Sequence, residues 1–187
     1  MGYHRSMLVG KRVILRHFKD SDIKALYELL SDKKVNTYLP WYPLKTIEEA
    51  RSFYEERLKD RKYTFAICLK DQDYPIGYVC ISEDDSHDMG YAIALKYQRQ
   101  GLVFEACTEV IAYLKKEGVA YITATHDEKN EASGKVMCKL GMRYLYSYKE
   151  RWMPKDIDAI FRLYELDIDM IERTYIGYWL MYQEHYI

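Results

Sequence analysis

Polar residues and a glycine separate an apolar strand-like run from an apolar helical run near the middle of the chain. The segment Gln98-Arg99-Gln100-Gly101 follows YAIALKY and precedes LVFEACTEVIAYL. A strand that turns at glycine into a helix directs unpaired N–H groups and the positive helix end at one point. Such a point binds anions, and Arg99 adds a charge suited to phosphate. An ordinary loop-to-helix junction with solvated side chains has the same local sequence, so both interpretations stay open.

A second polar pair follows the next strand-like run, AYITATH. Asn130 comes just after that run, and Ser133 lies three residues later in a short helix that Gly141 ends. Residues three apart on a helix share a face, so both side chains can point to one side. No G-x-G-x-x-G follows a strand and no G-x-x-x-x-G-K-S/T occurs, which argues against the usual dinucleotide and nucleoside-triphosphate loops.

On these two segments the chain resembles the GNAT superfamily of acyl-CoA-dependent N-acetyltransferases. Gln98-x-x-Gly101-x-Val103 is similar to the family's pyrophosphate loop, in which Gln or Arg precedes a Gly-x-Gly/Ala pattern. Asn130-x-x-Ser133, followed by KLGM, is similar to its motif B. The front segment LVGKRVILRHFKDSD is similar to the branch that includes ribosomal-protein N-terminal acetyltransferases.

The resemblance implies acetyl-CoA as the acyl donor and a role for each motif. The loop amides would hold the diphosphate, and Asn130 would reach an amide of the pantetheine arm. A backbone N–H of the AIAL strand would stabilise the oxyanion that forms when an amine attacks the thioester. The donor-binding residues implied in this way are Ile93, Ala94, Leu95, Gln98, Arg99, Gln100, Gly101, Leu102, Val103, Phe104, Asn130 and Ser133.

Two positions depart from the family pattern. Val103 stands where Gly or Ala is usual, and its side chain either crowds the diphosphate or joins an apolar helix stripe with Cys107 and Val110. We expect the second, because these residues have helical spacing. Met137 stands where many members carry a tyrosine that protonates the departing thiolate, so Ser133 is the candidate for that role. A non-catalytic acyl-CoA-binding or regulatory module remains the alternative to an enzyme.

An attacking amine must lose a proton, and Asp88 is the candidate base. It precedes the strand MGYAIAL, where the resembling branch often has Glu, although the acidic run EDDSHD is equally typical of a solvated turn. His126 is a weaker candidate, since a lone histidine at a strand end is usually structural. No histidine is placed by sequence to activate Cys107 or Cys138, which favours direct transfer in a ternary complex over an acyl-cysteine.

The resemblance implies a primary amine as acceptor, either a protein N-terminus or a small molecule. Tyr38, Trp41 and Tyr42 lie in the region that lines the acceptor side in this family, where they either clamp a substrate or cap the edge of the core. At the C-terminus, YIGYWLMYQEHY has aromatic residues at helical spacing. We expect this tail to pack within the chain rather than on a second copy, and monomer and homodimer both stay open.

The composition fits one domain with one sizeable core. The chain has 187 residues, 49% of them apolar, and its 28 Lys and Arg balance 29 Asp and Glu. That balance argues against a nucleic-acid partner. No apolar run approaches the ~20 residues of a membrane span, and the four separated cysteines form no C-x-x-C pair for a metal. We therefore expect a cytoplasmic protein with no metal site and no membrane partner.

Periodicity predicts the elements that must position these residues. Strand-like runs occupy 12–18, 63–70, 74–82, 89–95 and 120–126, a hairpin follows over 144–168, and helices start near Ser21, Thr46, Gly101 and Asn130. With the resemblance, this order predicts an α+β GNAT fold. Its mixed, mostly antiparallel central sheet has about 6–7 strands, is splayed between the fourth and fifth strands, and is flanked by about 4 helices.

The same reading divides the chain into three parts. Residues 1–6 are assigned to a tag or a disordered start, 7–168 to the acetyltransferase domain, and 169–187 to an aromatic C-terminal tail helix. No repeat or Pro/Gly-rich linker divides the chain further.

Overall fold

The computed structural model describes residues 6–187, so the expected tag or disordered start lies outside it except for its last residue. The described chain forms two compact units. The N-terminal unit comprises the residues up to Cys80 together with Tyr91–Val110, and the C-terminal unit comprises Ile81–Gly90 and Ile111–Ile187. Each unit contains an apolar cluster of buried residues.

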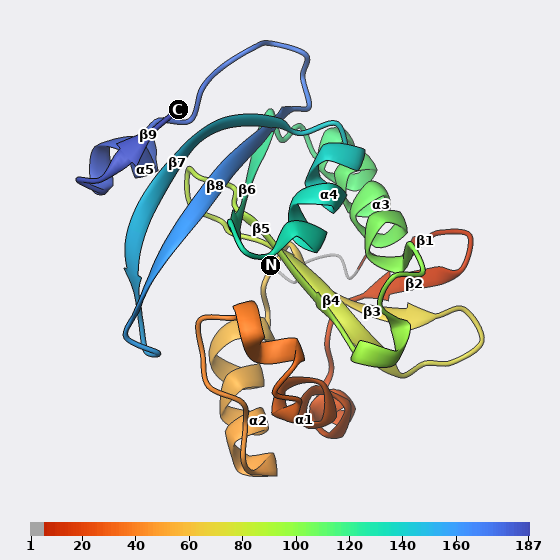
Figure 1. Cartoon of the computed structure of the whole chain (residues 1–187). Coiled ribbons are helices and arrows are strands. Elements are labelled where there is room, and N and C mark those ends of the chain that lie inside the picture. The colour runs from red at the N-terminus through yellow and green to blue at the C-terminus, as the bar shows by residue number, and fades with distance from the viewer. Residues whose placement is uncertain (1–5) are drawn as a thin grey trace. The chain divides into compact units, whose positions relative to one another are not determined.

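A five-stranded sheet runs through the N-terminal unit (Figure 1). Its order is β1-β2-β3-β4-β5, so each strand lies beside its neighbour in sequence, and the pairs from β1 to β4 are antiparallel. Strands β2 to β5 correspond to the first four predicted strands, whereas β1 is an additional two-residue strand. The bounds are Leu8–Val9 for β1, Val13–Arg16 for β2, Thr64–Leu69 for β3, Pro75–Ile81 for β4 and Met89–Ile93 for β5.

Helices α1 (Ile23–Ser31) and α2 (Ile47–Phe53) pack on each other and against this sheet. Apolar residues repeat along α1 at spacings of three and four, which gives it one continuous apolar side. The chain continues from α2 through a π-helical turn, Tyr54–Leu58. The buried residues of the resulting cluster are Phe18, Ile23, Leu26, Leu29, Leu30, Val35, Ala50, Phe53, Tyr54, Leu58, Ala66, Cys68, Tyr78 and Ala92.

The starts of these two helices differ in how well the sequence predicts them. Thr46 caps α2 as predicted, because its Oγ1 accepts the N–H of Glu49 at 3.1 Å. The Glu49 carboxylate accepts from the N–H of Lys45 at 2.6 Å, rather than from Thr46 as the reciprocal arrangement requires. Ser21 does not cap α1, since it lies inside a 3-10 turn, Asp20–Asp22, that precedes the helix.

Helix α3 (Leu102–Lys116) follows Gly101 as predicted. Its apolar side begins one residue earlier than expected, because Leu102 is buried and Val103 is only half-buried. Val103 therefore lies at the margin of the buried stripe rather than within it. The buried residues along the helix are Leu102, Ala106, Cys107, Val110 and Leu114.

A four-stranded sheet runs through the C-terminal unit in the order β6-β8-β7-β9 (Figure 1). β7 and β8 form the predicted hairpin, and β6 lies at the edge of the sheet. An isolated parallel bridge joins Asp88 and Thr123, and β5 and β6, the fourth and fifth predicted strands, belong to different sheets, as the predicted splay requires. The bounds are Tyr121–Asp127 for β6, Arg143–Trp152 for β7, Ile157–Asp167 for β8 and His185–Tyr186 for β9.

Helix α4 (Glu131–Lys139) packs on β6 and ends where the sequence predicts. Gly141 has a left-handed backbone, with φ of 85°. The N–H groups of Gly141 and Met142 donate to the carbonyls of Cys138 and Met137 at 3.0 and 3.1 Å. These bonds satisfy the last carbonyls of the helix, and glycine adopts the required φ without strain.

The predicted tail helix forms only at α5 (Gly177–Met181), and β9 follows it. Tyr146 Oη donates to the carbonyl of Tyr175 at 2.8 Å, and the N–H of Lys149 donates to the carbonyl of Glu184 at 2.9 Å. Because the backbone on both sides of α5 bonds to β7, it does not continue the helix. The aromatic side chains pack within the chain as expected, against the hairpin of β7 and β8; they are Tyr175, Tyr178, Trp179 and Tyr182.

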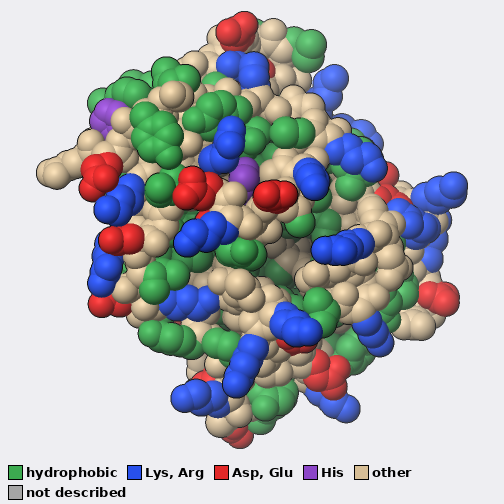
Figure 2. Space-filling model, viewed as in Figure 1, with side chains coloured by type: hydrophobic (Ala, Val, Ile, Leu, Met, Phe, Trp, Pro, Cys, Tyr) green, Lys and Arg blue, Asp and Glu red, His purple; other side chains and the backbone are tan. Residues whose placement is uncertain are grey.

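The surface carries charges of both signs. On the face shown in Figure 2, Lys and Arg side chains are interspersed with acidic and apolar ones. This distribution agrees with the balanced count of 28 basic and 29 acidic residues. Among residues 6–187, no helix combines the length and the apolar character that crossing a membrane requires.

Candidate functional site

The segment between β5 and α3 turns through two residues with left-handed backbone conformations. Arg99 and Gly101 both have left-handed conformations, with φ of 59° and 75°. Left-handed residues in a turn direct neighbouring N–H groups toward one side. The N–H of Glu105 bonds to the carbonyl of Gly101 at 3.0 Å, and within residues 6–187 no acceptor is recorded for the N–H groups of Arg99, Gln100 and Gly101. The predicted loop therefore presents backbone donors to its surroundings.

The glutamine side chains of this loop brace its backbone. Gln98 donates from Nε2 to the carbonyl of Ile93 at 3.3 Å, and Gln100 donates from Nε2 to the carbonyl of Lys96 at 2.9 Å. Both carboxamides therefore stabilise the turn, while the Arg99 side chain is exposed. These two side-chain hydrogen bonds hold the loop backbone.

An arginine from the N-terminal hairpin reaches the loop, and sequence reasoning missed it. Arg12 donates from Nη1 to the carbonyl of Gln100 and from Nε to the carboxylate of Glu105, each at 2.8 Å. A Cβ placed on Gly101 would lie 3.4 Å from Arg12 Nη2. Arg12 and Glu105 are 93 residues apart, so no local pattern could have linked them.

The expectation that Ile93–Leu95 supplies an oxyanion donor needs a correction at Ala94. The N–H of Ala94 donates to the carbonyl of Ile76 on β4 at 2.8 Å, so this group is already engaged. The next residue opens a 3-10 turn, Leu95–Tyr97, and is 43% exposed. The first N–H of a helical turn has no acceptor within the turn. Leu95 is therefore a better donor candidate than Ala94.

Asn130 and Ser133 come together at the first turn of α4. Asn130 Oδ1 accepts the N–H of Ser133 at 3.4 Å, so the asparagine side chain caps the helix. The predicted ligand anchor thus has a structural role that the sequence analysis did not assign, and its Nδ2 donor takes no part in the cap. Ser133 is half-buried at the helix start.

His126 lies on β6 beneath this helix. It is 6% exposed, its Nδ1 is 2.8 Å from the carbonyl of Asp127, and its Nε2 has no hydrogen-bond partner in the described part of the chain. A Cβ at Gly134 would lie 2.7 Å from Nε2, so α4 requires glycine there. Burial lowers the pKa of His126, which keeps the imidazole neutral near pH 7. We interpret it as structural support for α4, in line with the sequence expectation.

Asp88 has the surroundings of a group that titrates near neutral pH. Its Oδ1 is buried without a hydrogen-bond partner among the described residues, and its N–H donates to the hydroxyls of Ser82 and Ser86 at 3.1 and 3.2 Å. Burial, followed by the charges of Asp84 and Glu150, raises the pKa of Asp88 to about 7. In contrast, hydrogen bonding from Ser86 lowers the pKa of Asp84. Asp88 is thereby distinguished from its acidic neighbours in the turn.

Residues from β7 and the tail share the environment of this carboxylate. Burial and then the charge of Asp88 raise the pKa values of Tyr148 and Tyr178, whose rings lie 5.1 Å apart. Glu150 is two residues beyond Tyr148 on β7. Burial raises the pKa of Glu150, although a hydrogen bond with Tyr182 lowers it in part. Sequence reasoning missed this group, because its members are distant from Asp88 along the chain and meet it only through packing.

The predicted base and helix α4 lie toward opposite faces of the four-stranded sheet. Phe161 of β8 pairs with Tyr148 of β7 and with Asp127 of β6, and directly paired residues share a face. His126 adjoins Asp127 in the strand, so its ring lies on the other face, against Gly134 of α4. The carboxylate beside Tyr148 and the serine at the start of α4 are therefore associated with different faces.

The predicted aromatic loop divides between core and surface. The Trp41 ring meets Phe53 edge to face at 4.8 Å and lies 5.2 Å from the Arg57 guanidinium. Tyr38 and Tyr42 are 37% and 56% exposed. Trp41 therefore caps the edge of the core, whereas the two tyrosines remain at the surface.

The surroundings of Met137 and of two cysteines bear on the missing tyrosine acid and on the acyl-cysteine alternative. Met137, which replaces the tyrosine acid of many resembling proteins, is 1% exposed within α4. Burial raises the pKa of Cys107, and a buried thiol with a raised pKa is a poor nucleophile. Cys138 is exposed. These environments favour direct transfer over an acyl-cysteine at Cys107.

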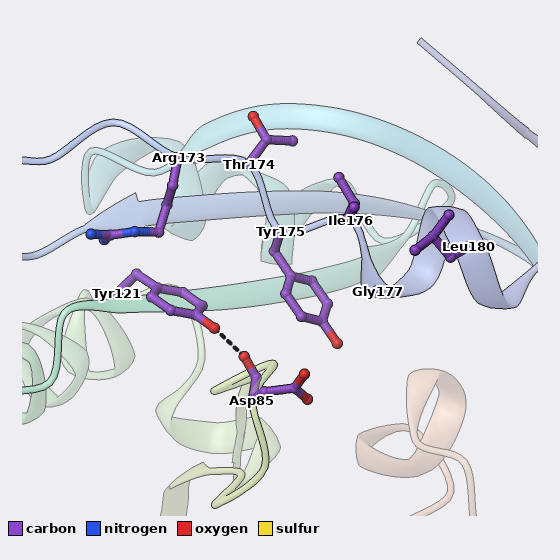
Figure 3. A pocket seen from close by; sticks show the side chains of 8 residues that line it. All are labelled: Asp85, Tyr121, Arg173, Thr174, Tyr175, Ile176, Gly177 and Leu180. Atoms are coloured by element: carbon purple, nitrogen blue, oxygen red, sulfur yellow. Dashed lines mark hydrogen bonds between the residues drawn. The ribbon is translucent and has the colours of Figure 1, made fainter.

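A cavity of about 330 Å³ lies beside the tail in the C-terminal unit (Figure 3). The hydroxyl of Tyr121 points to the backbone carbonyl of Asp85 and donates to it. Arg173 is paired with Asp167 and Asp169, so its charge is balanced. None of the predicted site residues lines this cavity, and we assign it no part in the reaction. The lining residues are Asp85, Tyr121, Arg173, Thr174, Tyr175, Ile176, Gly177 and Leu180.

Comparison with known sequences identifies relatives of this chain. The Acetyltransferase (GNAT) domain family matches residues 12–143. The uncharacterized N-acetyltransferase YnaD of Bacillus subtilis (strain 168) is 31% identical over 140 residues, which span 73% of this chain and 82% of YnaD. The family match includes both predicted motifs, at 98–103 and 130–133.

Solved structures share the fold. A GNAT-family acetyltransferase from Bacillus anthracis superposes with a TM-score of 0.77 at 24% identity, covering 88% of this chain and 99% of that one. The ribosomal L7/L12 alpha-N-protein acetyltransferase RimL, in complex with coenzyme A, superposes with a TM-score of 0.74 at 17% identity, covering 89% and 100%. At these identities the likeness concerns the fold alone.

Proposed function

This chain belongs to the GNAT acetyltransferase family, and from that premise we propose that it transfers an acetyl group from acetyl-CoA to a primary amine. The amine is a protein N-terminus or a small molecule, and it attacks the thioester carbonyl directly in a ternary complex. The observation that carries the proposal is the loop at Arg99 and Gly101, whose left-handed backbone and available N–H groups suit a diphosphate.

Acetyl-CoA binds as a substrate along the predicted donor site. The amides of Arg99–Phe104 and the positive end of α3 hold its diphosphate. Asn130 donates from Nδ2 to an amide of the pantetheine arm while its Oδ1 continues to cap α4. The backbone N–H of Leu95 stabilises the oxyanion, and one preorganised donor of this kind contributes about 3 kcal/mol.

Asp88 accepts the proton that the amine loses. Primary amines are largely protonated near neutral pH, so the reaction needs an acceptor in its basic form. At pH 7, a carboxylate whose pKa is about 7 is deprotonated in about half of the molecules. It also binds a proton more strongly than an ordinary carboxylate does. The unpartnered Oδ1 supports this role, because it leaves an acceptor position for the ammonium proton or for a relaying water.

Ser133 assists the departing thiolate. A thiol with a pKa of about 8.5 is a tolerable leaving group, so one hydroxyl donor is sufficient help. The serine donates its proton directly or positions a water molecule. Its place at the first turn of α4, three residues after the proposed pantetheine anchor Asn130, supports this role.

Release of free thiol from acetyl-CoA with a panel of amines tests the proposal, and calorimetry with CoA tests the donor site separately. Binding of CoA together with amine-dependent thiol release is the expected result. Binding without turnover on any amine would instead support a non-catalytic acyl-CoA-binding module. Failure to bind CoA at all would contradict both readings.

A further inference from the structure

Arg12 joins three parts of the N-terminal unit through one guanidinium. It belongs to the turn before β2, donates from Nε to Glu105 Oε2 in α3, and donates from Nη1 to the carbonyl of Gln100 in the loop. Both distances are 2.8 Å. A planar guanidinium can make two such bonds in fixed relative directions, which an ammonium cannot do.

The carboxylate that orients Arg12 is itself fixed. Glu105 also accepts the backbone N–H groups of Arg12 and Val13, the latter at 3.2 Å, and its side chain is 14% exposed. These hydrogen bonds outweigh its partial burial and lower its pKa, so the carboxylate is ionised at neutral pH. Arg12 is therefore held by an anchored anion on one side and by the loop carbonyl on the other.

The bond to the Gln100 carbonyl determines where the next N–H points. In a trans peptide the C=O and the following N–H are directed oppositely. With the Gln100 carbonyl turned toward Arg12, the N–H of Gly101 is turned away from it, and no acceptor is recorded for that N–H within residues 6–187. The left-handed φ of 75° at Gly101 accommodates this orientation.

We propose that Arg12 is a positioning residue for the donor diphosphate: by holding the Gln100 carbonyl from Glu105, it orients the Gly101 N–H toward the diphosphate of acetyl-CoA. This inference rests on the proposed function, because it assigns a role at the same loop. The charge of Arg12 also adds to the positive potential of the loop, but its side chain is 47% exposed, so solvent screens that contribution. Orientation of the peptide is the main effect.

Calorimetry with the full chain and three probes tests the role of Arg12. The variants are Arg12→Lys, which keeps the charge, and Arg12→Gln, which removes it; Lys11→Gln, at the exposed neighbouring residue, is the matched control. The probes are CoA, 3′-dephospho-CoA and S-acetylpantetheine, which lacks the diphosphate. A thermal unfolding curve for each variant shows whether it is folded at the assay temperature.

The expected result is a rise of about tenfold in Kd for CoA and for 3′-dephospho-CoA in both Arg12 variants, the size of one hydrogen bond to a charged group. The Kd for S-acetylpantetheine should be unchanged in the Arg12 variants, and the Kd of the Lys11→Gln variant for CoA should equal that of the parent. Glu105→Gln, which keeps Arg12 but removes its anion, should raise Kd in the same direction.

Three results would overturn the proposal while leaving CoA binding by the unmodified chain intact. Unchanged CoA affinity in folded Arg12→Lys and Arg12→Gln would show that Arg12 has no such role. An equal loss with S-acetylpantetheine would show a general structural effect. A loss confined to CoA, with 3′-dephospho-CoA unaffected, would assign Arg12 to the 3′-phosphate instead. If the unmodified chain does not bind CoA, the proposed function itself fails.

Discussion

The carboxylate of Glu165 accepts the backbone N–H of Tyr175 at 2.6 Å and holds the C-terminal segment soon after it leaves β8. Glu165 is 1% exposed, and its second oxygen has no hydrogen-bond partner among the described residues. Burial, and then the neighbouring Asp167 carboxylate, raise the pKa of Glu165 to about 7. The attachment of the tail therefore depends on a carboxyl group that resists ionisation.

Glu165→Gln should change the pH dependence of stability. Between the unfolded pKa near 4.5 and the folded value of about 7, the unfolded chain releases this proton and the folded chain retains it, so stability falls as pH rises through that window. Glutamine keeps an acceptor for Tyr175 without a charge. Thermal unfolding should show the variant roughly 1 kcal/mol more stable than the parent at pH 8 and similar to it below pH 4.5. Glu172→Gln, at an exposed residue, is the control, and equal curves for all three proteins would contradict the expectation.

Gly101→Ala should weaken CoA binding beyond its cost in stability. A left-handed backbone costs a non-glycine residue about 1 kcal/mol, and relief of that strain would turn the loop amides away from the ligand. Gly118→Ala is the matched control, since Gly118 has φ of 77° and open space around its Cβ position. Both variants should lose about 1 kcal/mol of stability, whereas only Gly101→Ala should raise Kd for CoA, by about tenfold or more. Similar affinities in calorimetry would remove the loop from the donor site.

Asp88→Asn should remove the low-pH limb of the activity profile. In the parent, kcat/KM should increase with pH as Asp88 ionises around its pKa of about 7. Asparagine cannot accept the proton, so we expect kcat/KM to fall about 100-fold and to lose this titration. Asp85→Asn, in the exposed part of the same turn, should keep the parent profile. If the Asp88→Asn variant still loses activity below pH 7 as the parent does, the base is a group other than Asp88.

The same substitution has an expected effect on stability. The folded pKa of Asp88 is raised above its unfolded value of about 3.8, so its contribution to stability is lost as pH rises toward 7. Asp88→Asn should therefore be more stable than the parent at pH 8 and less distinct from it at pH 4. Unfolding curves at the two pH values measure this difference independently of any substrate.

Ser133→Ala should lower kcat more than it lowers CoA affinity. The hydroxyl acts on the departing thiolate, which exists only as the reaction proceeds, while the helix cap uses the backbone N–H of Ser133 and survives the change. We expect a fall in kcat of about tenfold with Kd for CoA nearly unchanged. Ser31→Ala, at a hydroxyl on α1, controls for loss of a serine elsewhere. If Ser133→Ala keeps the kcat of the parent, Ser133 does not donate a proton to the leaving thiolate.

The positions of most elements, the loop and the helix caps could be predicted from the sequence because they depend on local patterns. Runs of apolar, β-branched and aromatic residues mark β2 to β8, and the three- and four-residue spacings mark α1 and α3. Thr46 and Gly141 act at helix ends because their own side chain or backbone freedom satisfies adjacent groups. The family resemblance likewise rests on short motifs, and the match over residues 12–143 confirms it.

The tail was mispredicted because aromatic spacing alone does not determine backbone hydrogen bonding. Residues from Tyr175 to Tyr182 have helical spacing, yet Tyr146 and Lys149 of β7 engage the backbone on either side of α5. Ala94 was mispredicted as a donor for a similar reason, since its N–H bonds to Ile76 of the neighbouring strand. In both cases the backbone group forms a hydrogen bond with a residue that is distant in sequence.

The sequence by itself determined which segments are helices and strands, which family the chain belongs to, and where the glycine turn before α3 lies. Only the tertiary structure decided that Arg12 holds that loop from Glu105, and that burial brings the pKa of Asp88 to about 7. The physical reason is the sequence distance over which each effect acts. Propensity and spacing act within a few residues, whereas burial and long-range hydrogen bonds depend on which distant segments pack together.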